Sequence, residues 1–76
     1  MTLLDGRIGD VFLVNYIDIQ EKVKKRLEIL GLTKGTQVKI LNNKRSGSTI
    51  IKLRGTRYAI GKEIAFAIKV RRKENE

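Results

Sequence analysis

The segment Arg26–Thr36, RLEILGLTKGT, constrains the fold more than any other, because it ends a helix, makes a turn and begins a strand. Gly31 stands where a helix C-terminus favours the left-handed conformation, since glycine has no Cβ to clash there. Leu32 follows at the position that often packs back on the last helical turn, here on Leu27. Gly35 supplies the positive φ that a type II turn requires at its third position. The segment therefore predicts a helix-to-strand junction.

A helix is predicted from about residue 19 to residue 30. Asp18 is a short acceptor at the N-cap position, and Glu21 places a carboxylate in the first turn. Apolar side chains recur along one side at i, i+4, i+8 and i+11, namely Ile19, Val23, Leu27 and Leu30. We expect the last three of these to pack the helix across a sheet. Arg26 lies at the edge of the stripe, where its aliphatic stem can cover apolar surface.

The remaining chain reads as short strands. Composition and alternation predict them at Asp10–Ile17, Thr36–Leu41, Thr49–Arg54, Arg57–Ile60 and through Ile68 and Val70. A polar loop is expected at residues 42–48, and a short helical turn at Lys62–Ala67. Gly55-Thr56 reads as a two-residue II′ hairpin turn, a register that places Arg54 opposite Arg57.

This order predicts a mostly β fold: a small SH3-like five-stranded barrel with one α-helix inserted after the first strand and a short helical turn before the last strand. An OB-fold is the second choice, because its helix usually falls between the third and fourth strands. With 76 residues, the chain is expected to be a single domain over residues 1–76 with a modest core.

The charge is unevenly distributed. Residues 1–31 carry five basic and five acidic side chains, whereas residues 32–76 carry twelve basic and three acidic ones, so the whole net charge of +9 lies in the second part. Such a basic surface suits nucleic acid, an anionic membrane face or an acidic protein. No signal peptide and no apolar run long enough to span a bilayer is recognised, so we expect a cytoplasmic protein.

The side chains argue against catalysis and against tight binding of transition metals. The sequence contains no His and no Cys, which removes the usual general base, the imidazole ligand and the thiolate ligand. We therefore expect no enzyme activity, no catalytic residue, no metal site and no cofactor. Nucleic-acid binding has basic residues in its favour, including Lys52, but the pattern places most of the four aromatic residues in the core, so stacking platforms are scarce.

Three stretches together resemble a known family: RLxxLGLTxGTxV at residues 26–38, LRGTRYAI at residues 53–60 and GKEIAFAIKV at residues 61–70. The chain resembles the ferrous iron transport protein A (FeoA) family over about residues 3–71. Lys34 departs from a proline that is common in the family's turn, and residues 45–47 depart from a loop containing proline, leucine and glycine. The same domain also ends metal-dependent repressors of the diphtheria-toxin-repressor type, but we expect a free-standing accessory protein without a DNA-binding half.

The resemblance implies a small cytoplasmic accessory of ferrous iron uptake that contacts a FeoB-type membrane permease or its GTP-binding domain. Membrane contact is expected only through the permease. The expected contact residues are Lys22, Lys25, Arg26, Ile29, Arg54 and Arg57. The alternative is a basic SH3-like nucleic-acid-binding module, as found in some ribosomal and transcription proteins.

Overall fold

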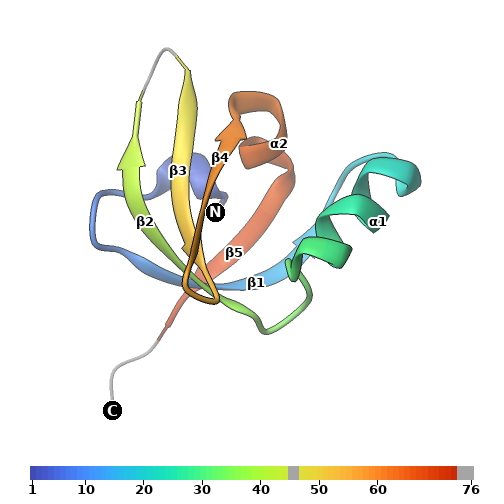
Figure 1. Cartoon of the computed structure of the whole chain (residues 1–76), viewed down its shortest axis with the longest axis horizontal. Coiled ribbons are helices and arrows are strands. Elements are labelled where there is room, and N and C mark those ends of the chain that lie inside the picture. Colours follow the sequence, from blue (N-terminus) through green and yellow to red (C-terminus); the bar gives the residue numbers. More distant parts are fainter. Residues whose placement is uncertain (45–46, 74–76) are drawn as a thin grey trace.

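The computed structural model describes residues 1–44 and 47–73 (Figure 1). Its elements are η1 (Leu3–Asp5), β1 (Val11–Ile17), α1 (Glu21–Leu30), β2 (Gln37–Asn43), β3 (Ser48–Leu53), β4 (Thr56–Gly61), α2 (Lys62–Ala67) and β5 (Ile68–Arg72). The predicted mostly β fold, with one helix after the first strand and a short helix before the last, is confirmed. The 3₁₀ helix η1 was not predicted; the hydroxyl of Thr2 caps it by accepting from the Leu4 amide. Neither α-helix of the described residues is long and apolar enough to span a membrane.

The five strands form one antiparallel sheet in the order β4-β3-β2-β1-β5. The expectation of a barrel that closes is therefore wrong, because β4 and β5 are the two edges of an open, curved sheet (Figure 1). α2 joins these two strands and contacts both. The edge of β5 is covered instead by the N-terminus, through a bridge from Thr2 to Lys69.

The core lies on the concave side of the sheet and draws on every strand. Its fully buried members include Phe12, Val38, Ile40, Ile51, Leu53 and Ile68. One polar side chain ties the N-terminal segment to this core: Asn43 Nδ2 donates to the carbonyls of Leu3, Leu4 and Gly6, and Asn43 Oδ1 accepts from the hydroxyl of Thr49. Asn43 therefore belongs to β2, where a polar loop was expected, because its side chain has partners inside the fold.

The start of α1 differs from the prediction. The helix begins at Glu21, and its N-cap residue is Gln20, whose side chain makes no capping hydrogen bond. Asp18, the expected N-cap, lies before this start, where its amide donates to the Ala67 carbonyl at 2.8 Å next to the β1–β5 pair of Ile17 with Ile68.

Fewer side chains of α1 pack against the core than predicted. Leu27 is buried, and Val23 is half-buried against the core. Leu30 was expected in the core but is 41% exposed. Figure 1 shows the reason, because α1 stands to one side of the sheet beside β1 and does not cross it. The helix consequently presents most of its surface to solvent.

Candidate functional site

The C-terminal end of α1 is fixed by the hydrogen bonds that the sequence predicts. Gly31 is left-handed at φ 112°, its amide donates to the Glu28 carbonyl, and the Leu32 amide donates to the Leu27 carbonyl, both at 3.0 Å. These two bonds form a Schellman motif. The turn that follows has Gly35 at φ 86° and a bond from the Thr36 amide to the Thr33 carbonyl, as predicted. The orientation of α1 relative to β2 is therefore defined by local backbone geometry.

Four of the six predicted contact residues lie on one side of α1. At about 100° per residue, they cover an arc of roughly 100° beside the buried stripe. We call this surface the helix shoulder; it consists of Lys22, Lys25, Arg26 and Ile29, all exposed. Ile29 is 84% exposed, although it is a large apolar residue. The helix shoulder thus combines one exposed apolar side chain with three cations.

Arg54 and Arg57 do not form the cross-strand pair that was predicted. The observed register pairs Leu53 with Thr56 and Lys52 with Arg57, so the turn residues are Arg54 and Gly55. Both turn residues have positive φ, 51° and 81°, as in a type I′ turn. This backbone twist matches the twist of the flanking strands, and Arg54 accepts the left-handed conformation to provide it.

The observed turn sends Arg54 toward α1. A Cβ at Gly31 would lie 3.4 Å from Arg54 Nε, so the Arg54 side chain passes beside the C-terminal end of α1. The carbonyl groups at a helix C-terminus carry partial negative charge, which favours a cation there. The structure therefore places Arg54 at the end of α1, which carries the helix shoulder, and leaves Arg57 on the sheet.

Arg57 belongs to a second basic surface. Lys39 of β2 pairs with Lys52 of β3, and Lys52 pairs with Arg57 of β4, so the three occupy neighbouring positions across three strands. All three are exposed. We call Lys39, Lys52 and Arg57 the cationic row. The sequence-based register missed it because the hairpin was placed one residue out of step.

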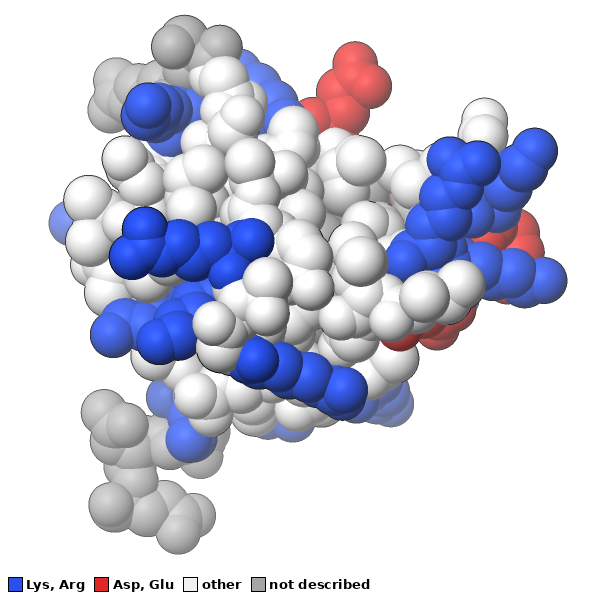
Figure 2. Space-filling view, viewed as in Figure 1, with Lys and Arg blue, Asp and Glu red and all other residues white. Residues whose placement is uncertain are grey.

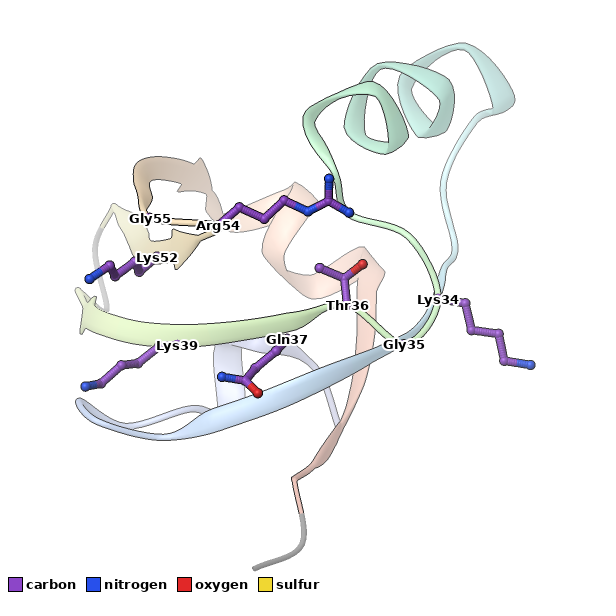
Figure 3. A pocket seen from close by; sticks show the side chains of 8 residues that line it. All are labelled: Lys34, Gly35, Thr36, Gln37, Lys39, Lys52, Arg54 and Gly55. Atoms are coloured by element: carbon purple, nitrogen blue, oxygen red, sulfur yellow. The ribbon is translucent and has the colours of Figure 1, made fainter.

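An open depression of about 730 Å³ lies between the turn after α1 and the β3–β4 hairpin. Its lining includes Lys34, Lys39, Lys52 and Arg54 but no acidic residue. Figure 3 shows that these cations point in different directions: Arg54 toward α1, Lys34 away from the depression, and Lys39 and Lys52 toward its far side. The four cations do not surround one point, because Arg54, Lys34 and the parallel pair Lys39 and Lys52 point to three different sides.

Two aromatic residues are exposed, contrary to the prediction that most would be buried. Tyr16 is 59% exposed and Phe66 is 60% exposed. A register shift between Val14 and Tyr16 turns Tyr16 outward, although strict alternation after Val14 would have placed it inside. Tyr16 pairs with Lys69, whose Nζ lies 4.5 Å from the centroid of the Phe66 ring. These aromatics lie on β1 and α2, not among the cationic row.

The carboxylates of the described residues are dispersed over the molecule. Within residues 1–44 and 47–73, no three His, Cys, Asp or Glu side chains come together as ligands would. With neither His nor Cys in the sequence, the donor set does not fit a transition metal. Asp10 has a structural partner instead, because its Oδ1 lies 3.4 Å from Arg72 Nη1. This is the one ion pair among the described residues, so the helix shoulder, Arg54 and the cationic row have no acidic partner there.

The pKa of Asp10 is lowered from its ordinary value. The main cause is the hydrogen bond that its Oδ2 accepts from the Arg7 amide at 2.8 Å, and the positive charge of Arg72 adds to the effect. Both interactions favour the ionised carboxylate, because each stabilises its negative charge.

Known proteins resemble this chain in sequence and in structure. A sequence model described as the FeoA domain matches residues 1–72. The crystal structure of an iron uptake regulatory protein (FeoA) is 32% identical, covers 96% of each chain and superposes with a TM-score of 0.86. The solution structure of a FeoA protein from Chlorobium tepidum is 25% identical, covers 100% of this chain and 73% of that one, and has a TM-score of 0.88.

The fold also occurs as part of longer proteins. The crystal structure of ScaR with bound Cd²⁺ is 19% identical and has a TM-score of 0.82, over 96% of this chain and 35% of that one. At this identity the likeness concerns the fold alone. No curated protein is similar enough to match the chain.

Proposed function

The chain belongs to the FeoA family, and on this premise we propose that it is a small cytoplasmic accessory of ferrous iron uptake that acts by contact with a FeoB-type membrane permease. The similar solved structures support the connection to iron, since one is described as an iron uptake regulatory protein and another as an iron(II) transport protein A. The proposed contact is made with the permease's cytoplasmic, GTP-binding part.

The observation that carries this proposal is the exposure of Ile29 on the helix shoulder. The side chain of Ile29 is 84% exposed, and burying so large an apolar surface against a partner would stabilise the complex. Buried apolar anchors surrounded by polar residues dominate many protein interfaces. Lys22, Lys25 and Arg26 supply such a polar surround, and their charge would steer the chain toward an acidic surface.

We include Arg54 in this proposed contact surface and exclude Arg57 from it. Arg54 lies beside the end of α1, so we assign it to the same interface as the helix shoulder. Arg57 lies in the cationic row with Lys39 and Lys52, and we assign it to a separate surface. The proposed mechanism is protein–protein contact that stabilises or gates the transporter, with no iron held by this chain.

Capture on a detergent-solubilised FeoB-type permease tests the proposal. The test variant is Ile29→Glu, and the matched control is Ile8→Glu, because Ile8 is also an isoleucine with high exposure, 71%, and lies outside the helix shoulder. Both substitutions should leave the fold intact, since neither side chain is in the core.

We expect Ile29→Glu to weaken capture at least about 10-fold, as loss of an interface anchor does. Ile8→Glu should bind like the unmodified chain. Equal binding by both variants would refute the assignment to the helix shoulder, and failure of the unmodified chain to bind would refute the permease contact itself.

A further inference from the structure

We propose that the cationic row, with the sheet face around it, binds the anionic surface of a phospholipid membrane directly. This inference goes beyond the permease contact and uses a different face of the molecule. It rests on the register of the sheet, on the distribution of acidic residues and on the directions of the basic side chains.

The register places three like charges side by side. Residues directly opposite in an antiparallel pair project from the same face, so Lys39, Lys52 and Arg57 form one line across β2, β3 and β4. Adjacent strands lie about 4.8 Å apart, which is well within the distance over which exposed charges interact at physiological salt. Like charges in directly opposite positions are unfavourable by themselves. A negatively charged surface that approaches this face would relieve the repulsion.

No acidic residue of the described chain neutralises the row. Acidic residues lie instead in the N-terminal segment, in and before α1, and in α2: Asp5, Asp10, Asp18, Glu21, Glu28 and Glu63. Figure 2 shows basic side chains spread over the part of the molecule that holds β2, β3 and β4, with acidic atoms visible only near the two α-helices. The face is therefore complementary to an extended anionic surface.

The directions of the side chains favour a membrane over a small anion or a nucleic acid. Lys39 and Lys52 point to the same side of the depression, whereas Arg54 points to the other side, toward α1, so the cations do not gather around one phosphate, but an extended surface can meet Lys39 and Lys52 together (Figure 3). The exposed aromatics Tyr16 and Phe66 lie on β1 and α2, which leaves this face without a described residue on which bases could stack. Lysines near an anionic leaflet contribute through diffuse attraction that needs no defined geometry.

Vesicle sedimentation tests the proposal with the whole chain. The probes are vesicles of phosphatidylglycerol mixed with phosphatidylcholine and vesicles of phosphatidylcholine alone. The row variant carries Lys39→Ala, Lys52→Ala and Arg57→Ala, and the matched control carries Lys22→Ala, Lys25→Ala and Arg26→Ala. Each variant removes three positive charges from exposed positions, so only the face differs. Circular dichroism shows whether both variants are folded.

We expect the unmodified chain to sediment with the phosphatidylglycerol vesicles only, and less so as salt is raised. The row variant should lose on the order of 100-fold in partitioning, and the control only a few-fold. Equal losses in both variants would overturn the proposal, because net charge alone would then explain binding. Absence of vesicle binding would also overturn it, as would row-dependent binding to duplex DNA or to polyglutamate without binding to vesicles.

Discussion

Gly31 decides how α1 ends, because its φ of 112° is a conformation that other L-residues adopt only with strain. We predict that Gly31→Ala lowers the free energy of unfolding by roughly 1–2 kcal/mol. The added Cβ would also meet Arg54 Nε at 3.4 Å. The matched control is Gly47→Ala, where φ is ordinary and no atom lies within 4 Å of the new Cβ. Urea unfolding of the two variants measures the difference, and equal stabilities would contradict the prediction.

Asp10 should make the stability depend on pH in a defined direction. Because its pKa is lower in the folded chain than the ordinary value of about 3.9, its ionised form stabilises the fold above that value, and this contribution is lost as the pH falls through the folded pKa. We predict that Asp10→Asn is less stable than the unmodified chain at neutral pH and that the gap narrows in acid. Urea unfolding over a pH series checks this; a gap that does not vary with pH would show that Asp10 acts only through neutral contacts.

The helix α1 is attached to the core mainly through one buried side chain, that of Leu27. Leu27 is buried among the core residues, whereas Ile29, two positions along the same helix, is exposed. We predict that Leu27→Ala costs about 2–5 kcal/mol, which would largely unfold a domain of this size. Ile29→Ala should change stability by less than about 0.5 kcal/mol. Thermal melts of both variants measure this, and a melt of Leu27→Ala that matches the unmodified chain would exclude α1 from the core.

The elements that local chemistry determines were the ones predictable from sequence. The end of α1 and the turn after it follow from Gly31 and Gly35, and the structure confirms both. The start of α1 was predicted two residues too early, because the sequence offers Asp18 as a capping side chain, whereas the observed N-cap, Gln20, makes no side-chain capping bond that a sequence could signal. The open sheet was not predicted either, because closure would require hydrogen bonds between β4 and β5, and the order of strands along the sequence does not determine whether those bonds form.

The hairpin shows how a small error in register alters a predicted site. Both Gly55-Thr56 and Arg54-Gly55 are acceptable two-residue turns, and the choice between them depends on the conformation of Arg54, which the sequence does not reveal. The difference of one residue separates Arg54 from Arg57. It also pairs Lys52 directly with Arg57 in the cationic row; the sequence places these two on one basic strand face but does not indicate that Lys39 joins them. The members of the helix shoulder were predictable because helical periodicity alone places them together.

The whole molecule carries a net charge of +9, and its sequence contains neither of the side chains, His and Cys, that commonly bind transition metals. We predict that anaerobic calorimetry with ferrous iron detects no stoichiometric binding, because the sequence offers neither imidazole nor thiolate and the described carboxylates are dispersed. A stoichiometric isotherm with an affinity of about 1 μM or tighter would contradict an accessory that acts by contact alone.

We propose above that the helix shoulder contacts the permease's cytoplasmic domain. The most direct measurement is to titrate that isolated domain into the ¹⁵N-labelled chain and to follow the backbone amide shifts. We predict that the largest changes fall on residues 22–31 and on Arg54, with little change at Lys39, Lys52 and Arg57. Shift changes confined to those three positions, or no changes at all, would contradict it.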